Sequence, residues 1–593
     1  MKKIYSIFAV GTIAVGAMLS SCSDFLTEDA SGQLTVESFF KTSDDLDMAV
    51  NALYFNVAQA WSNSNPTIPA CQGDDMTSTT GSNKSAYLSA DAYQEPSDYK
   101  GINQLWLWQY NVIQAANPII DNAEKVSTSQ ENINIALGNA YFWRAYAYFQ
   151  LVRTFGPLPL NLHNESDNNS TPLSSVEEVY NLIVSDLTKA EACNLPVSYS
   201  GRKLGFKDET NLWISEQAVK SMLTAVYMNM AGYPMNKTEY YKTAADKAKE
   251  VVDGVKSGKY PQALEPEWKD VYSYGKNFSK EQIVTISYIA IPGNMSNTSS
   301  QFSLCHRFAQ FNSGWGDFLA ERHYWAQYPE GPRKDAVYDP QIYIYQREDE
   351  TGDPICISWW ATKDEQPYEF GKTNNLVSVY HPMFSPFSVN ADESGNPVAA
   401  PYDYSKPQIT LMSVDQAHRV IRYAEVLCWF AESAARAGVY QAEALAALKE
   451  VQDRAYPAGY TPDNSDLAEA AYREHGYEVA GYPLALVTRR SDEFRMNRLK
   501  EAWEYRHGAQ DAVIVPKGTI THSYKEERVV DPVTHRPKYV KKKYTYELGY
   551  DLVIKENMDV AETWDGENSI YQVYPPMETE KNPLISVSNR PKN

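Results

Sequence analysis

The fold of this 593-residue chain is constrained most by one aromatic stretch, Ala140–Leu160. Apolar and aromatic residues recur there at the spacing of a helix, and they also occupy most of its other faces. A helix of this composition is buried nearly all round. Upstream, Thr128 and Glu131 have the spacing of a capping box. Gly156-Pro157 predicts the end of the helix, because glycine accepts a left-handed cap and proline cannot donate the next hydrogen bond. The chain is therefore expected to build its core around this helix.

Further amphipathic stripes predict helices joined in pairs by short turns. Ser175 and Glu178 form a second capping-box pattern, at the start of an apolar stripe that runs to Ala190. The other paired stripes cover residues 219–230, 241–252, 420–437 and 442–455. Several helix hairpins with small residues at the crossing positions predict a tetratricopeptide-like stack, although no constant repeat period is present. We therefore expect a mostly α fold.

The chain changes character twice along its length. A helical scaffold is expected over residues about 40–260 and 410–510. Between these parts, residues about 260–406 carry proline, glycine and aromatics without helical period, with one strand candidate at Glu281–Ala290. This pattern predicts a looped insertion, and loops are where binding residues tend to lie. Residues about 511–593 form a C-terminal hairpin and tail, with the hairpin expected at Ser523–Tyr546.

The N-terminus has the pattern of a lipoprotein signal. Met1–Lys3 is basic, Ile4–Leu19 is apolar, and the sequence Leu-Ser-Ser-Cys that ends at Cys22 reads as a lipobox. Cleavage of residues 1–21 would leave Cys22 to carry lipid, so attachment to the membrane is expected through acyl chains. The remaining cysteines are odd in number and widely spaced, which indicates neither a disulfide framework nor a zinc site.

The charge and the motif content exclude several classes of protein. A net charge of −21 repels phosphate backbones, so nucleic acid is not expected as a partner. We find no H-E-x-x-H, P-loop or G-x-S-x-G motif, and the nine histidines lack metal-ligand spacing. The sequence thus predicts no catalytic residue, no metal site and no cofactor.

Several stretches resemble motifs of the SusD/RagB family. Residues 142–160, Phe-Trp-Arg-Ala through Phe-Gly-Pro-Leu-Pro-Leu, are similar to that family's longest motif, and Ser175–Leu187 is the next best match. Trp108, Tyr110, Ile113 and Asn117 resemble a second helical motif, and further similarities lie at Ile421–Leu427, Asp453–Ala455, Tyr574–Glu578 and Asn582-Pro583. The match weakens from Phe494 to Gly508, where relatives usually carry Arg-Arg-x-Glu-Leu and Trp-Asp-Leu. The resemblance extends from the lipobox to the C-terminus, so residues 22–593 are identified as one SusD-like domain.

The resemblance implies a function. Proteins of that family are cell-surface lipoproteins that capture glycans and pass them to a SusC-like, TonB-dependent outer-membrane transporter. For this chain it implies a tetratricopeptide-like helical fold, an oligo- or polysaccharide ligand, attachment to the outer membrane at Cys22 with the protein facing the exterior, and no catalysis.

Two regions have the residue mixture that a glycan site needs. Sugar rings present apolar C–H faces to Trp and Tyr rings, and their hydroxyls need polar partners. The first region is the loop with Asp74, Asp75, Lys84, Tyr87, Tyr93 and Tyr99, and the second is the insertion with Trp315, Trp325, Trp359, Trp360 and Tyr368. Each has a simpler interpretation: the aspartates could brace a turn, and the tryptophans could belong to the core. If Trp359-Trp360 lie on a strand, at most one of the two rings is free.

Two other functions stay open at this stage. A surface glycoside hydrolase would need two carboxylates about 5 to 10 Å apart, which a sequence with 75 acidic residues always permits. A peptide-binding helical scaffold is the other, because grooves of tetratricopeptide-like stacks often hold peptides. The identity of the glycan cannot be read from the sequence.

Overall fold

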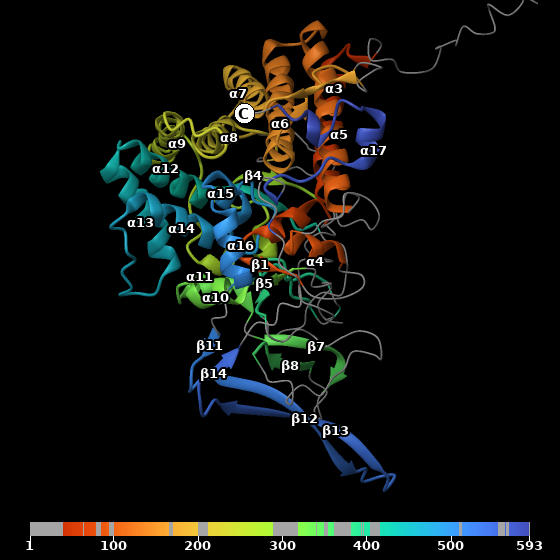
Figure 1. The fold of residues 1–593 in the computed structure, drawn as a ribbon, viewed down its shortest axis with the longest axis vertical. Coiled ribbons are helices and arrows are strands. Elements are labelled where there is room, and N and C mark those ends of the chain that lie inside the picture. The colour runs from red at the N-terminus through yellow and green to blue at the C-terminus, as the bar shows by residue number, and fades with distance from the viewer. Residues whose placement is uncertain are drawn as a thin grey trace, which may run out of the picture.

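A computed structural model describes residues 39–62, 65–78, 85–93, 100–164, 170–199, 212–288, 318–339, 341–348, 354–360, 381–392, 394, 396–401, 403, 415–508, 513–554, 564 and 569–591. Helices make up the upper part of the molecule in Figure 1, and short strands gather toward its lower end. The predicted mostly α class is confirmed. Cys22 and the rest of the expected signal segment lie outside the described residues.

Each long helix packs on the one that follows it. Contacts run from α3 to α5, α6, α7, α8 and α9, and then to α12, which also contacts α13 and α14 (Figure 1). The bounds of these helices are α3 Ser43–Ala60, α5 Lys100–Asn122, α6 Gln130–Phe155, α7 Val176–Ala192, α8 Glu216–Ala231, α9 Tyr240–Lys256, α12 Tyr423–Ala437, α13 Gln441–Ala455 and α14 Leu467–Val479. Successive helices in contact are the arrangement expected of a stack of helix hairpins.

The central helix is α6, which the aromatic stretch predicts. From Ile135 to Phe155 every side chain is buried except Tyr141 and Gln150. The expected capping box is wrong: Ser129 is the N-cap and accepts a hydrogen bond from the Asn132 amide at 3.2 Å. The predicted stop is confirmed by Gly156, whose φ is +75°, a value that glycine adopts without strain. The second predicted box is present at α7, where Ser175 and Glu178 cap each other.

Arg144 of α6 explains why three of the sequence motifs occur together. Its Nε and Nη2 donate to the Asp186 carboxylate of α7 at 2.8 and 2.9 Å, and its Nη1 donates to Asn117 of α5 at 3.0 Å. All three side chains are buried. A buried guanidinium needs this kind of full pairing, so the motif residues fix the geometry of three helices.

Helices α9 and α12 are in direct contact although residues 257–422 separate them in sequence. Strand β4 (Gln282–Ile286) pairs antiparallel with β10 (His418–Arg422), so residues 418–422 form a strand where the periodicity predicts the first turn of a helix. A strand here lets the chain enter α12 from the sheet. The other elements of this region are β5 Leu319–Ala320, α10 Arg322–Gln327, α11 Pro332–Val337, β6 Tyr338–Asp339, β7 Gln341–Glu348, β8 Pro354–Ser358 and β9 Met383–Phe384.

The C-terminal part returns to the body and ends beside the first helices. The predicted hairpin is confirmed by β12 (Ile520–Val530) and β13 (Pro537–Glu547), which form a two-stranded sheet of their own among the described strands and project from the lower end in Figure 1. The remaining elements are η1 Asn65–Gln72, β1 Met76–Thr77, α4 Ser85–Asp91, β2 Leu158–Pro159, β3 Leu173–Ser174, α15 Arg489–Arg495, α16 Leu499–Gly508, β11 Val513–Val515, β14 Leu552–Ile554 and α17 Pro576–Lys581. Within the described residues, no helix has both the length and the apolar character that crossing a bilayer requires.

Candidate ligand pocket

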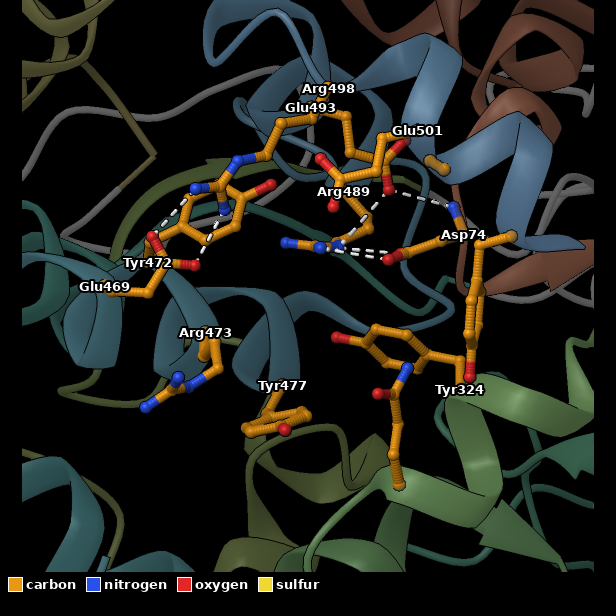
Figure 2. A pocket seen from close by; sticks show the side chains of 13 residues that line it. Asp74, Tyr324, Glu469, Tyr472, Arg473, Tyr477, Arg489, Glu493, Arg498 and Glu501 are labelled. Carbon is orange, nitrogen blue, oxygen red and sulfur yellow. Dashed lines mark hydrogen bonds and ion pairs between the residues drawn. The ribbon is translucent and has the colours of Figure 1, made fainter. Parts of the chain in front are cut away.

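A pocket of about 330 Å³ lies where α10, α14, α15 and α16 meet the loop that follows η1 (Figure 2). This volume is at the lower end of the range of about 300–1,000 Å³ for small-ligand pockets. The lining residues are Asp74, Tyr324, Gln327, Glu469, Tyr472, Arg473, Tyr477, Arg489, Glu493, Arg498, Glu501, Ala502 and Tyr505. Four tyrosines among charged side chains give the pocket both apolar ring faces and polar groups.

Three side chains form the inner end of the pocket, and we call Asp74, Arg489 and Glu493 the pocket cluster. Arg489 opens α15 directly after its N-cap Thr488, and one helical turn later the same face carries Glu493. The Asp74 carboxylate accepts from Arg489 Nε and Nη2 at 2.7 and 2.9 Å, which is a bidentate ion pair. The backbone amide of Asp74 donates to Glu493 at 3.0 Å. Asp74 is thereby joined to a helix more than 400 residues away in sequence.

The third guanidinium nitrogen of Arg489 remains available. Its Nη1 is buried and has no hydrogen-bond partner among the described residues. The whole residue is only 9% exposed. In Figure 2 the guanidinium lies at the centre of the pocket between Tyr472 and Tyr324. The rings of these tyrosines have their centroids 4.8 and 5.7 Å from the guanidinium carbon. Gly476 leaves room beside it, because a Cβ there would sit 2.9 Å from Nη1 and 3.0 Å from the Tyr324 hydroxyl.

The carboxyl groups near Arg489 differ in pKa. Burial acts to raise the pKa of Asp74, but the Arg489 guanidinium outweighs burial and holds that pKa below its usual value. Burial and the neighbouring Asp74 raise the pKa of Glu493 well above its usual value. The same two causes raise the pKa of Asp75 to about 7. One guanidinium thus keeps one carboxylate ionised, while burial and that charge favour the protonated form of its two neighbours.

The rim of the pocket is polar and more accessible. Gln327, Arg473, Glu501 and Tyr505 are exposed there, and Tyr505 is 41% exposed. Arg498 forms a bidentate pair with Glu469 at 2.7 and 3.0 Å and lies 4.8 Å from the Tyr472 ring centroid. The rim therefore offers a partly exposed ring and several polar groups to a ligand that enters from solvent.

The residues predicted for the first glycan region lie in different settings. Asp74 is in the pocket cluster, and Asp75 is buried behind it, where it accepts from the Gly481 amide at 2.7 Å. Tyr87 is buried with its ring 5.3 Å from that of Phe318. Tyr93 is buried, and its hydroxyl donates to the Gln72 carbonyl at 2.9 Å. Lys84 and Tyr99 lie outside the described residues. Of the described members, only Asp74 lines the pocket.

The described tryptophans of the second region, Trp325, Trp359 and Trp360, do not line the pocket. Trp359 is 1% exposed, and Trp360 is also buried, with its Nε1 donating to Thr521 at 3.1 Å. Both rings are therefore packed, and the sequence argument allows at most one free ring if the pair lies on a strand. Trp325 is partly buried and packs edge-on against Trp359, with the ring centroids 4.9 Å apart. Trp315 and Tyr368 lie outside the described residues. The role of these side chains in glycan binding stays a prediction.

Sequence reasoning missed most of the pocket, including Arg489, Glu493, Tyr324 and Tyr472. A local signal was present at Thr488–Glu493, where a capping residue precedes two basic and then two acidic residues within an apolar neighbourhood. That signal predicts a short helix with buried charges. It does not reveal that Arg489 pairs with Asp74, because no spacing rule connects residues so far apart.

Comparison with known proteins gives consistent matches. A family described as starch-binding and associating with the outer membrane, SusD-like_3, matches residues 24–228. SusD-like protein P2 of Formosa agariphila is 24% identical over 476 residues, which cover 77% of this chain and 82% of that protein. A crystal structure of a SusD homolog from Bacteroides thetaiotaomicron has a TM-score of 0.65 at 17% identity, covering 94% of this chain and 98% of that one. A crystal structure with xylogluco-oligosaccharide has a TM-score of 0.63 at 18% identity, covering 92% and 99%. At these identities the solved structures establish a shared fold.

Proposed function

Because the chain belongs to the SusD/RagB family, we propose that it is a cell-surface receptor that captures oligo- or polysaccharide and delivers it to a TonB-dependent outer-membrane transporter. A relative that shares the fold over 92% of this chain was crystallised with xylogluco-oligosaccharide, which supports a sugar ligand. Lipid at Cys22 would hold the protein on the outer face of the membrane.

The observation that carries the proposal is the pocket. It combines four tyrosines with a buried guanidinium nitrogen that has no partner among the described residues. Sugar rings stack their C–H faces on aromatic rings, and sugar oxygens accept hydrogen bonds from such donors. A pocket of this kind suits a carbohydrate better than an extended peptide, whose backbone would need a matching row of donors and acceptors.

The pocket cluster also raises the alternative of a glycoside hydrolase. Asp74 and Glu493 have pKa values shifted in opposite directions, which is the electrostatic pattern of a glycosidase acid and its partner carboxylate. Their geometry argues against that role. Both carboxylate oxygens of Asp74 accept hydrogen bonds from Arg489. Because the ionised Asp74 is held in this bidentate ion pair, it is not placed to act as the second carboxylate of a glycosidase, so we propose binding without hydrolysis.

The test is a calorimetric titration of the purified full-length protein against a panel of neutral and acidic polysaccharides, with reducing ends assayed in the same samples. Saturable heat without new reducing ends is the expected result. Affinities in the micromolar to millimolar range correspond to about −8 to −4 kcal/mol. New reducing ends would show that the protein hydrolyses the glycan and would contradict the proposal of a non-catalytic receptor. Heat with peptides and none with any polysaccharide would favour a peptide receptor.

The lipid anchor has a separate test. Cells fed a palmitate analogue should label the wild-type protein and leave a Cys22→Ser variant unlabelled. Equal labelling of the two proteins would place the lipid on another residue or exclude it.

A further inference from the structure

We propose that the pocket binds a neutral sugar residue of the captured glycan and discriminates against a residue that carries a carboxylate or a sulfate, with Arg489 Nη1 donating to an oxygen of the bound sugar. This inference rests on the proposed function and names the class of ligand for this pocket.

The charges that line the pocket give the first reason. Arg473, Arg489 and Arg498 face four carboxyl groups, those of Asp74, Glu469, Glu493 and Glu501. The lining therefore has no excess of positive charge, and protonation of Glu493 brings it only to balance. The two arginines with the best geometry are already neutralised, Arg489 by Asp74 and Arg498 by Glu469. An anionic sugar would lose hydration without gaining a free cation at the inner end of the pocket.

The available donor gives the second reason. Arg489 Nη1 is buried and has no partner among the described residues, so a ligand oxygen that approaches it completes the pairing of this guanidinium. A hydroxyl or ring oxygen accepts such a bond without adding a charge beside Asp74. A carboxylate would accept it as well, but its charge would lie close to the ionised Asp74 carboxylate, and like charges at short range repel.

The rings and the size of the pocket give the third reason. Tyr505 presents an exposed ring on α16, and Tyr477 on α14 is half-buried. In Figure 2, Tyr477 and Tyr324 lie on the same side of the Arg489 guanidinium. A sugar whose oxygen meets Arg489 can therefore stack its C–H face on a tyrosine ring. The small volume admits only a short piece of a polysaccharide chain, so we expect the pocket to bind one end or one branch of the glycan.

The experiment compares matched probes on the full-length protein. The first probe is the polysaccharide of the panel that gives the strongest saturable heat. The second probe is the same polysaccharide with its primary hydroxyls oxidised to carboxylates. We expect the oxidised form to bind at least about tenfold more weakly, equivalent to about 1.4 kcal/mol. If only acidic polysaccharides bind, or if the oxidised form binds as well as the neutral one, the inference is overturned while glycan capture stands. If no polysaccharide in the panel binds, the proposed function itself fails.

Variants locate the effect in the pocket. Glu501→Gln removes a rim carboxylate, so it should narrow the difference between the two probes, whereas Glu504→Gln on the same helix, outside the pocket lining, should not. Gly476→Ala places a methyl group against Arg489 Nη1 and should weaken binding of the neutral probe about tenfold. Tyr505→Ala should weaken that binding several-fold, and Tyr550→Ala, which removes a ring that is 60% exposed outside the pocket, is its control. Unchanged binding in both Gly476→Ala and Tyr505→Ala would place the ligand elsewhere and overturn the inference.

Discussion

Two buried clusters of arginines and carboxylates in this protein differ in whether the terminal guanidinium nitrogens of their arginines donate to protein atoms. The first, which we call the closed cluster, consists of Arg333, Arg422, Arg454, Glu281 and Glu478. Both terminal nitrogens of each of its arginines donate to protein atoms, for example Arg422 Nη1 to Glu281 at 2.8 Å and Arg333 Nη1 to Glu478 at 2.9 Å. In the pocket cluster, one terminal nitrogen of Arg489 has no such partner in the part of the chain that the structure describes.

The two clusters differ in what their ion pairs do in the protein. Burial acts to raise the pKa of Glu478, but the three arginines outweigh burial and lower it, so this carboxylate stays ionised and holds α14 to its neighbours. The pocket cluster has one arginine for two carboxyl groups. The pKa of Glu493 therefore rises, and so does the pKa of Asp75, which lies beside the cluster. The closed cluster, whose terminal nitrogens are all paired and whose residues do not line the pocket, stabilises the fold. A cluster with a free donor next to a pocket can also bind a ligand.

The largest effect should come from breaking the closed cluster. Replacing Arg422 with Met leaves Glu281 and Glu478 with one partner fewer in a buried site. We expect the free energy of unfolding, measured in urea, to fall by about 3–5 kcal/mol. Arg473→Met, at an exposed arginine, should change it by less than about 0.5 kcal/mol. Equal effects of the two substitutions would show that Arg422 in the closed cluster contributes no more to the free energy of unfolding than an exposed arginine does.

The next largest effect should be a dependence of stability on pH that comes from Asp75, which lies beside the pocket cluster. The pKa of Asp75 rises from 3.8 to about 7 on folding, so the folded protein binds more protons between these values. The free energy of unfolding should therefore fall as the pH rises from about 4 to 7, by about 1.4 kcal/mol for each unit by which folding raises the pKa of Asp75. Above about pH 7 it should level off. Asp75→Asn should remove this part of the slope and should be at least as stable as wild type at pH 8. Parallel curves for the two proteins would contradict the shift.

The smallest effect on stability should come from Arg489→Lys. Lysine keeps a positive charge beside Asp74 but loses the bidentate fork and Nη1. We expect the free energy of unfolding to fall by about 1–2 kcal/mol. Glycan binding should weaken more than about tenfold, whereas Arg422→Met should affect stability more than binding at temperatures where it stays folded. A variant that binds normally would show that the available nitrogen is not used.

How far the sequence predicts this protein depends on how local the interactions are. The buried helix around Trp143, the capping pair of Ser175 and Glu178, and the hairpin at residues 520–547 follow from patterns within a few turns of the chain, and the structure confirms them. Residues 420–422 are predicted as the start of a helix but belong to the strand β10, because a short apolar run is ambiguous until its partner β4 is known.

The pocket shows the limit of that approach. Asp74 was predicted from its composition and its loop, and it does line the pocket. Its partner Arg489 lies 415 residues away, so only the fold brings the pair together. The aromatic candidates show a related limit: Tyr87, Trp359 and Trp360 occur in loop-rich sequence, yet they pack into the interior because large rings gain most from burial, and their role in glycan binding stays a prediction. Composition indicated the kind of residue that a glycan site needs and could not indicate which rings remain accessible.

The most direct test of the account is hydrogen exchange of backbone amides, measured with and without the polysaccharide that binds in titration. The account predicts slower exchange in α10, α14 and α16 around the pocket and unchanged exchange in α3 and α7. Protection confined to other parts of the chain would contradict the assignment of the ligand to this pocket.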